Sequence, residues 1–379
     1  MDNEASVRDR NADPAWQFAD ELGPRAIMHF HNADAGLKAI LVVDNVAAGP
    51  SIGGVRMASD VSLSECFRLA RAMTLKNAAA GLRHGGGKSV IFAEPKMASD
   101  RKESLIRAFA NAIGDIRDYI VGPDMGTNEQ CMGWVWDEIR RAVGLPREIG
   151  GIPLDEIGAT GWGVAACARV AAPYCDLPLD GARVAIQGFG SVGKHAARFL
   201  NESGAVVVAA SDSRACVASQ DGIDVDALAA HKLSTGSVEN FPGTHTMERD
   251  GIIGSACDIW IPAARPDVIH SGNVGQLNTR LIIQGANIPI TGEAEEQLAQ
   301  RGVLVIPDFI ANAGGVICAA VEYARGTQHD AMRTIEEKIT ANTTEILEYA
   351  KQDDVTPRAA AMAMAERRVR DAMALRRRY

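Results

Sequence analysis

The sequence lacks several features that would place the protein in familiar classes. Its seven cysteines are odd in number and form no Cys-x-x-Cys pair, which favours reduced, buried thiols over a disulfide framework or a zinc site. Basic residues are the minority, with 39 Lys and Arg against 48 Asp and Glu and a net charge of −9. This balance argues against nucleic acid as the main partner, because phosphate binding needs a basic surface. A small anionic substrate needs only a local positive pocket.

Long apolar segments are also missing. No run of about 18 apolar residues is present, so we expect no membrane span. The first residues, MDNEASVRDRNADPAWQ, have no apolar core of the kind that a signal peptide requires, and we therefore expect a cytoplasmic protein. At 379 residues and 47% hydrophobic composition, the chain exceeds what one core usually supports, which predicts two domains.

The first part of the chain predicts an α/β domain over residues 1–150, in which short apolar runs alternate with helical patterns. SECFRLARAMTLKNAAAGL carries apolar residues at three- and four-residue steps, with Ser62 or Ser64 as the N-cap, so Lys76 lies in the last turns of a helix. SVIFAEP and YIVGP are predicted strands. Asp124 lies where the second opens into a loop, a usual place for a functional residue on a rigid support.

Lys88 follows the glycine run Gly85–Gly87, where bare backbone allows another backbone or a ligand to approach closely. The sequence GGGKS does not fit a phosphate-binding P-loop, because the spacing to the preceding glycine is wrong and a helix precedes the motif while a strand follows it. Most lysines lie on the surface, but neither the alanines around Lys76 nor the apolar strand after Lys88 resembles a solvated face. A lysine in a partly dry cleft beside a second cation can act as a base.

The second part of the chain carries a dinucleotide motif. A predicted strand at 184–187 runs into GFGSVG, a helix follows, and a second strand ends near Asp212. The glycines allow a tight turn, close approach of a pyrophosphate and close packing of helix on strand. Asp212 falls near the position, about 20 residues after the first glycine, where an acidic residue binds the ribose and favours NAD over NADP. The alternative is a strand-end residue that faces water.

Further strands are predicted in ACDIWIPAA, RLIIQGAN and VLVIPDF, which implies a parallel, doubly wound Rossmann domain over residues 151–325. Ligand residues belong at the carboxyl ends of its strands, and Asp258, Asn287 and Asn312 are expected to occupy or follow such ends. Residues 326–379 are predicted to form C-terminal helices that pack back toward the N-terminal domain. The basic terminus RRVRDAMALRRRY is expected to be a solvated or frayed helical tail.

Several motifs together resemble a known family. KNAAAGL, GGGK, GPDMGT, GFGSVG, GAN and PDFIANAGGV, in this order, are similar to those of the amino-acid dehydrogenases for glutamate, leucine, phenylalanine and valine. The resemblance covers roughly residues 30–323. It implies reversible, nicotinamide-dependent oxidative deamination of an L-amino acid to a 2-oxo acid and ammonia, by a closed homo-oligomer whose two domains close over the cleft.

The resemblance also assigns residues. Lys76 looks like the lysine that binds the substrate α-carboxylate, Lys88 like the one that activates water, and Asp124 like the aspartate that exchanges protons with the amino nitrogen. The implied substrate site comprises Lys76, Ile52, Gly53, Gly54, Gly122, Asn287, Val316 and Ala319. The implied dinucleotide site comprises Gly188, Gly190, Ser191, Val192, Gly193, Asp212, Thr160, Asp258, Asn287 and Asn312. No metal is expected.

The resemblance bears on the substrate side chain. In the glutamate branch, a lysine before Gly-Gly and a serine after NAGGV hold the second carboxylate, and these positions match Ile52 and Ala319 here. A pocket of Ile52, Val316 and Ala319 gives that carboxylate no charge partner, and burying it unpaired costs several kcal/mol. We therefore expect an apolar L-amino acid, with Gly122 leaving room for a ring and Val316 nearer the leucine type. The alternatives are a glutamate dehydrogenase and a catalytically silent NAD-binding regulator.

Overall fold

A computed structural model describes residues 17–376 of the chain. The described residues fall into two compact units. The N-terminal unit contains the chain up to Thr74, residues 83–142 and the chain from Val369 onward, and the C-terminal unit contains residues 75–82 and 143–368. Segments 1–16, for which no signal peptide was predicted, and 377–379, the end of the basic terminus, lie outside the described residues.

The N-terminal unit is built on a mixed sheet in the order β1-β2-β4-β3-β5. β1 and β2 form an antiparallel hairpin and β2 pairs antiparallel with β4, whereas β3 runs parallel to both β4 and β5. The strands are β1 (Ala26–Asn32), β2 (Leu37–Asn45), β3 (Ser51–Ala58), β4 (Gly85–Phe92) and β5 (Tyr119–Pro123). β4, which carries the predicted catalytic lysine, therefore lies at the centre of the sheet.

Helix α1 (Leu63–Ala79) packs on this sheet with a stripe of apolar residues against β2 and β4. Its N-cap is Ser62, whose Oγ accepts from the N–H of Glu65 at 3.1 Å. Helices α2 (Ser99–Ala112) and α3 (Glu129–Ile139) pack against each other, and α2 also contacts β1 and β2. The apolar periodicity of SECFRLARAMTLKNAAAGL thus predicted α1, which ends at Ala79.

The glycine run lies inside a strand. Gly85–Gly87 begin β4, four residues earlier than the predicted strand, and of the two predicted alternatives the structure shows the close approach of other backbone segments. A Cβ on Gly85 would lie 1.7 Å from the carbonyl oxygen of Asn45, and one on Gly86 would lie 2.0 Å from the amide nitrogen of Thr74 in α1. The glycines therefore let β2 and α1 approach the strand that carries Lys88.

The C-terminal unit contains a seven-stranded sheet in the order β12-β11-β10-β6-β7-β8-β9. Its strands are β6 (Arg183–Gln187), β7 (Val206–Ser211), β8 (Ala215–Ala218), β9 (His245–Glu248), β10 (Ile259–Pro262), β11 (Leu281–Ile283) and β12 (Leu304–Ile306). The strands from β12 to β7 are parallel, as predicted, but β8 and β9 are antiparallel to their neighbours. These two strands are short, four residues each, and carry no long apolar run that would have predicted them.

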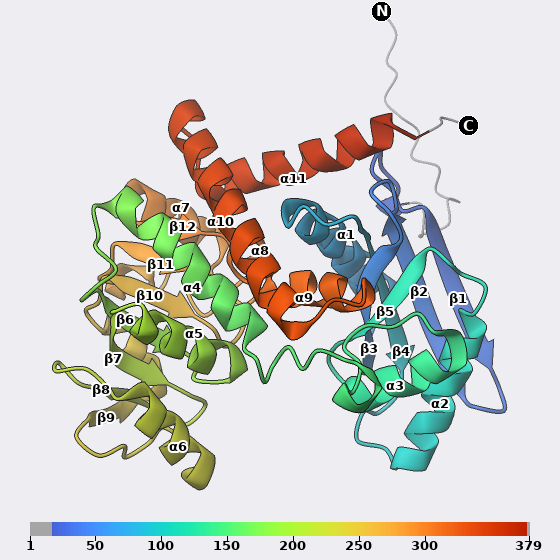
Figure 1. Cartoon of the computed structure of the whole chain (residues 1–379), viewed down its shortest axis with the longest axis horizontal. Helices are drawn as coiled ribbons and strands as arrows, with labels where there is room; N and C mark the ends of the chain where they lie inside the picture. The colour runs from blue at the N-terminus through green and yellow to red at the C-terminus, as the bar shows by residue number, and fades with distance from the viewer. Residues whose placement is uncertain (1–16, 377–379) are drawn as a thin grey trace, which may run out of the picture. The chain divides into compact units, whose positions relative to one another are not determined.

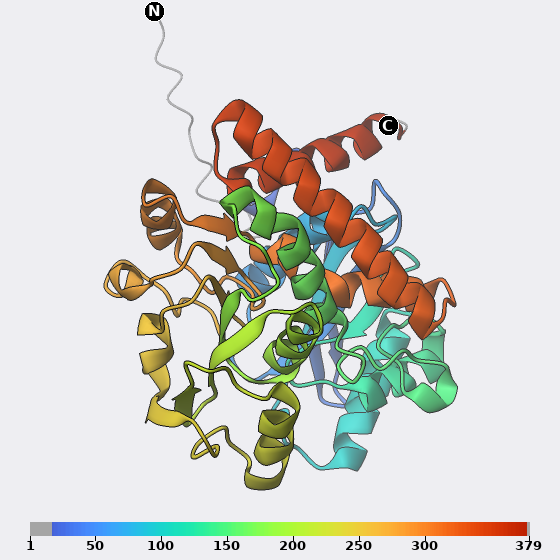
Figure 2. The same ribbon diagram turned by 60° about the vertical axis from the view of Figure 1, so that its left-hand side comes forward.

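The helices of the C-terminal unit are α4 (Ala159–Ala171), α5 (Ser191–Glu202), α6 (Val225–Thr235), α7 (Gly292–Gln300), α8 (Asp308–Ala311), α9 (Gly314–Tyr323), α10 (Gln328–Asp353) and α11 (Pro357–Ala374). Short 3₁₀ turns occupy Arg147–Ile149, Ala172–Cys175, Arg249–Gly254 and Val274–Gln276. α4 begins after Gly158, which has a left-handed φ of 71°, and it lies along α10 in both views (Figures 1 and 2). The two-unit α/β architecture with a Rossmann sheet agrees with the predicted fold class.

The basic terminus is not a frayed tail over the part that the structure describes. It forms α11, which joins the C-terminal unit as far as Arg368 and the N-terminal unit from Val369. Arg368 donates to the carbonyls of Ala78 and Ala79 at the end of α1, at 3.2 and 2.8 Å. Within residues 17–376, no helix is long and apolar enough to cross a membrane.

Candidate functional site

Lys88 and Asp124 meet in the N-terminal unit. Lys88 is the fourth residue of β4 and is only 6% exposed, and its Nζ lies 2.5 Å from Oδ2 of Asp124. Asp124 follows β5 directly and begins a tight turn, in which its N–H donates to Oγ1 of Thr127 at 3.0 Å. The predicted catalytic lysine and aspartate are therefore brought together by two strands that both flank β3.

Arg56 is a third member of this cluster, and it was missed at the sequence level. Its Nε donates to Oδ2 of Asp124 at 3.2 Å and its Nη1 to Oε1 of Glu65 at 2.5 Å. Arg56 lies two residues after Gly54 on β3, so the period-two alternation of a strand places both on the same face. That alternation is the signal that could have found Arg56 beside the predicted Gly53–Gly54 pair.

The cluster holds Asp124 in its ionised form. Burial by itself raises the pKa of the Asp124 carboxyl, but the charge and hydrogen bond of Lys88 and the charge of Arg56 outweigh it, and the net pKa is below its usual value. The carboxylate is thus ionised at neutral pH and loses its charge only in strongly acidic solution.

Gly54 leaves the room that this cluster occupies. A Cβ at Gly54 would lie 2.8 Å from Cβ of Asp124 and 3.3 Å from Nζ of Lys88. Ile52, two residues earlier on β3, shares this face of the strand. Gly53 faces the other way, against the carbonyl of Gly87, and Gly122 of β5 pairs with Gly54. Of the residues predicted from β3, Gly54 and Ile52 therefore face the Lys88–Asp124 side.

Lys76 lies in the last turn of α1, within the C-terminal unit, where its Nζ donates to Oδ1 of Asn312 at 2.6 Å. Asn312 in turn donates from Nδ2 to Oδ1 of Asn287 at 2.9 Å. This turn of α1 is anchored, because Lys338 donates to the carbonyl of Gly81 and Arg368 to those near the end of the helix. Three of the predicted residues thus form one hydrogen-bonded chain.

Helix α9 places two predicted pocket residues on one side. Val316 and Ala319 are three residues apart and both half-buried, while Ile317 and Cys318 between them are buried. α9 begins close to the start of α4, since a Cβ on Gly315 would lie 3.4 Å from Oγ1 of Thr160. The structure therefore brings Thr160 to the amino end of the helix that carries Val316 and Ala319.

The GFGSVG loop has the geometry that a pyrophosphate needs. Gly188 has a φ of 95°, and a Cβ on Gly193 would lie 2.0 Å from the carbonyl oxygen of Gly188. At Gly190, by contrast, nothing lies within 4 Å of the missing side chain. Ser191 and Val192 form the first turn of α5, which has no side-chain cap, so its amide groups are available to a phosphate.

Asp212 does not offer a free carboxylate. It is 9% exposed and accepts from the N–H groups of Arg214, Ala215 and Val238, from the hydroxyl of Ser237 and from the ammonium of Lys232, at 2.8–3.3 Å. Burial raises the pKa of this carboxyl. The backbone hydrogen bonds from Arg214, Val238 and Ala215 and the charge of Lys232 lower it by more, so the net pKa is below its usual range. Asp212 therefore already has five protein donors, and its contact with the ribose stays a prediction.

Asp258 is also not where it was expected. It precedes β10 instead of following it, and it exchanges hydrogen bonds with the backbone of Arg183 at the start of β6. Because β6 and β10 are parallel, Asp258 lies at the amino ends of the strands, opposite the GFGSVG loop. The apolar run IWIP begins after Asp258, and Ala263 and Ala264 at its far end are the residues that adjoin Gly188.

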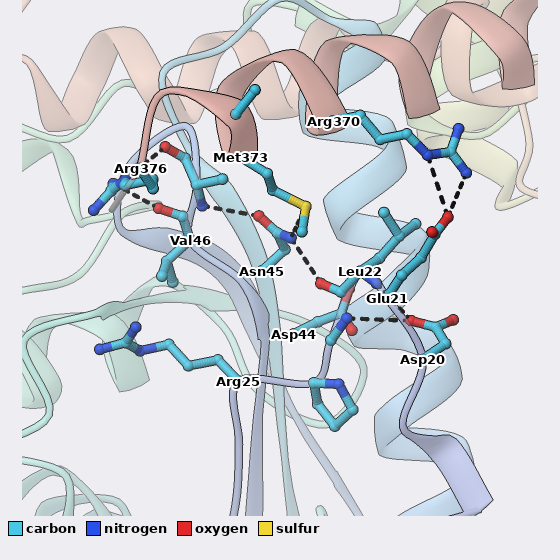
Figure 3. A pocket seen from close by; sticks show the side chains of 14 residues that line it. Asp20, Glu21, Leu22, Arg25, Asp44, Asn45, Val46, Arg370, Met373 and Arg376 are labelled. Carbon is cyan, nitrogen blue, oxygen red and sulfur yellow. Dashed lines mark hydrogen bonds and ion pairs between the residues drawn. The ribbon is translucent and has the colours of Figure 1, made fainter. Parts of the chain in front are cut away.

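Other candidate sites are limited. The described residues contain no group of His, Cys, Asp and Glu arranged to hold a metal ion. A cavity of about 840 Å³ lies in the N-terminal unit, between the β2–β3 loop and the end of α11 (Figure 3). Arg370 pairs there with Glu21 and Arg376 donates to the carbonyl of Val46, while none of the predicted site residues is among the described residues that line the cavity.

Comparison with known families decides the identity of the two units. A family model described as Glu/Leu/Phe/Val dehydrogenase, dimerisation domain, matches residues 24–141, and one described as Glutamate/Leucine/Phenylalanine/Valine dehydrogenase matches residues 150–377. The chain belongs to this family of amino-acid dehydrogenases. It is thus an oxidoreductase that acts on a CH–NH₂ group with a nicotinamide dinucleotide.

Individual relatives are mostly named for glutamate. The glutamate dehydrogenase of Aeropyrum pernix is 39% identical, over 88% of this chain and 85% of its own length, and the NADP-specific glutamate dehydrogenase of Saccharolobus shibatae is 39% identical over 88% and 83%. Among solved structures, the hetero-hexameric glutamate dehydrogenase of Thermus thermophilus has a TM-score of 0.83 at 26% identity, covering 94% of this chain and 91% of that one. L-tryptophan dehydrogenase of Nostoc punctiforme has a TM-score of 0.73 at 26% identity, covering 93% and 98%.

The role of Arg56 can be tested by Arg56→Gln. Asp124 would keep only one of its two cations, so we expect kcat to fall about tenfold to a hundredfold, equivalent to about 1–3 kcal/mol. Because the pKa of Asp124 rises when Arg56 is removed, the acid limb of the pH–rate profile should move to higher pH. Arg25→Gln, which breaks an exposed ion pair with Asp118, is the matched control. An unchanged kcat and acid limb in Arg56→Gln would remove Arg56 from the account.

Proposed function

We propose that this dehydrogenase oxidatively deaminates an apolar L-amino acid and that it uses Lys88, Asp124, Lys76 and Asn312 to do so. The observation that carries the proposal is the buried contact of 2.5 Å between Nζ of Lys88 and Oδ2 of Asp124. A lysine and a carboxylate in direct contact inside a sheet can pass a proton between them, which is what hydrolysis of an imine requires.

Each residue has a separate task in this proposal. The ammonium of Lys76, oriented by Asn312, pairs with the substrate α-carboxylate. A bound nicotinamide supplies the chemistry of hydride acceptance from the α-carbon. The Lys88 ammonium first passes its proton to Asp124 across their direct contact. Neutral Lys88 then takes a proton from the water that attacks the resulting imino acid, and protonated Asp124 delivers its proton to the departing amino nitrogen. Arg56 keeps Asp124 oriented between these steps.

The side-chain preference rests on uncharged residues. Ile52, on the same strand face as Gly54, and Val316 and Ala319, on one side of α9, have no charge to offer a second carboxylate. Leaving such a group buried and unpaired is costly. These residues support branched aliphatic or aromatic substrates. The names of the 39% identical relatives favour glutamate as the second candidate.

A substrate panel separates the two candidates. Reduced dinucleotide formation is measured with leucine, valine, phenylalanine, tryptophan and glutamate under identical conditions. We expect kcat/KM for the best apolar amino acid to exceed that for glutamate by at least about a hundredfold, because an unpaired buried carboxylate costs about 3 kcal/mol or more. Activity confined to glutamate would contradict the apolar pocket. Ile52→Lys serves as a gain-of-function comparison, since it supplies the cation at this position and should raise activity on glutamate.

The dinucleotide preference depends on what surrounds the end of β7. NAD was predicted from Asp212, but that carboxylate is already used by five protein donors. Ser213 and Arg214 are exposed beside it, and Lys232 also donates to the carbonyl of Phe189 in the GFGSVG loop at 2.9 Å. Arg214 and Lys232 are two cations beside Asp212, and Lys232 offsets the charge of the Asp212 carboxylate. Together these groups would attract a 2′-phosphate instead of repelling it. We therefore propose that the enzyme uses NADP at least as well as NAD, in keeping with the name of one 39% identical relative.

Lys232→Met tests this preference. The substitution keeps an apolar stem and removes the ammonium, so kcat/KM for NADP should fall at least about tenfold while that for NAD changes less than about threefold. Lys351→Met, in the last turn of α10, is a control for the loss of one positive charge. A wild-type enzyme that prefers NAD over NADP by tenfold or more would contradict the proposal and restore NAD as the physiological partner.

We also propose that the chain forms a closed homo-oligomer. Two findings support this assembly, namely the match of residues 24–141 to a dimerisation-domain family model and the similarity to the hetero-hexameric Thermus thermophilus enzyme. Oligomers of soluble proteins are mostly closed and symmetric, so each interface of such an assembly is repeated in every subunit.

A further inference from the structure

A buried polar cluster at the start of α11 has no part in the chemistry so far described. The guanidinium of Arg358 donates to Oε2 of Glu295 at 2.7 Å, to Oδ1 of Asp308 at 3.2 Å and to Oε1 of Gln284 at 2.9 Å. Glu295, Asp308 and Gln284 are each 6% exposed or less. Two carboxylates thus share one guanidinium, and Oε1 of Glu295 is buried without a hydrogen-bond partner among the described residues.

Such a cluster is a poor way to stabilise a core, because apolar residues of similar volume would pack there without any desolvation cost. Its geometry points to a different role. The second carboxylate oxygen of Asp308, Oδ2, accepts from the N–H of Ile288 at 2.9 Å. Asp308 therefore ties the Arg358 cluster to the turn that follows strand β11.

That turn is strained and needs support. Ile288 has a φ of 48°, in the left-handed region that a β-branched residue rarely adopts, and its side chain is 56% exposed. Packing of the Ile288 side chain therefore does not hold the conformation, and the hydrogen bond to Asp308 is one of the contacts that does. The residue just before it is Asn287, whose amide orientation depends on this turn.

Asp308 also positions Asn312. The N–H of Asn312 donates to the carbonyl of Asp308 at 2.8 Å, so one residue fixes both Asn287 and Asn312. Nδ2 of Asn312 donates to Oδ1 of Asn287, which leaves Oδ1 of Asn312 to accept from the ammonium of Lys76. If the amide turned over, its NH₂ would face that ammonium, which has no acceptor.

We infer that Arg358 is a positioning residue that acts through Asp308, Asn287 and Asn312 to orient Lys76 toward the substrate α-carboxylate. The inference rests on the proposed function, in which Lys76 binds that carboxylate. All the residues of this chain of contacts belong to the C-terminal unit. In this inference the Arg358 cluster orients the Lys76 ammonium, so loss of the cluster should weaken substrate binding.

The test uses the full-length enzyme with Arg358→Met and Arg358→Lys. For Arg358→Met we expect KM for the best amino acid to rise at least about tenfold, while the Kd of the reduced dinucleotide, measured by its fluorescence, changes less than about twofold. Arg358→Lys keeps the positive charge but loses the planar guanidinium that donates to three residues at once. Its KM should therefore fall between those of the wild type and Arg358→Met. Arg367 lies on α11 like Arg358 and forms an exposed ion pair with Glu345 of α10. Arg367→Met removes this ion pair and should leave KM within about twofold of the wild type.

Several results would overturn the inference. These are an unchanged KM in Arg358→Met, a rise of KM and dinucleotide Kd by the same factor, or an equal rise of KM in Arg367→Met. If Arg358→Met does not fold, Arg358→Lys decides, and an unchanged KM in that variant overturns the inference. A wild-type enzyme without activity on any amino acid overturns the proposed function and the inference together, whereas an active wild type with an unaffected Arg358→Met overturns the inference alone.

Discussion

The ion pair between Lys88 and Asp124 imposes the main constraint on the N-terminal unit. To hold an ammonium and a carboxylate 2.5 Å apart with little exposure, β4 and β5 must flank a strand that leaves space between them. Gly54 supplies the space, and the glycines at the start of β4 allow α1 and β2 to press against that strand. Arg56 supplies a second cation, so that the carboxylate is ionised despite its burial. The glycines of this region therefore allow close packing, and this packing places Lys88 against Asp124.

In the C-terminal unit, uncharged amide groups orient one half-buried charge, the ammonium of Lys76. Lys76 is held by Asn312, Asn312 is held by Asn287, and both amides depend on Asp308. Amides can orient an ammonium without cancelling its charge, so that the charge can still attract a substrate carboxylate. The same unit surrounds Asp212 with several hydrogen-bond donors and one cation, Lys232.

Much of the architecture was predictable because it depends on local patterns. The period of α1, the strand before GFGSVG and the apolar runs of β10 to β12 each carry their own signal. Motifs in the sequence named Lys88, Asp124, Lys76, Asn287 and Asn312, and the structure pairs Lys88 with Asp124 and links Lys76 through Asn312 to Asn287. Arg56, Asp308 and Arg358 were missed because their roles depend on contacts between distant segments. Asp258 was misplaced because a sequence does not show at which end of a strand an acidic residue falls. The protein donors that surround Asp212 were also not visible in the sequence.

Lys88 is proposed to take part in the chemical step and not in dinucleotide binding. The most direct measurement is turnover of Lys88→Ala with the best amino acid, together with the Kd of the reduced dinucleotide. Loss of a positioned base predicts that kcat falls about a hundredfold to ten-thousandfold while the Kd stays within about twofold of the wild type. Turnover within about tenfold of the wild type, at saturating substrate, would contradict the account.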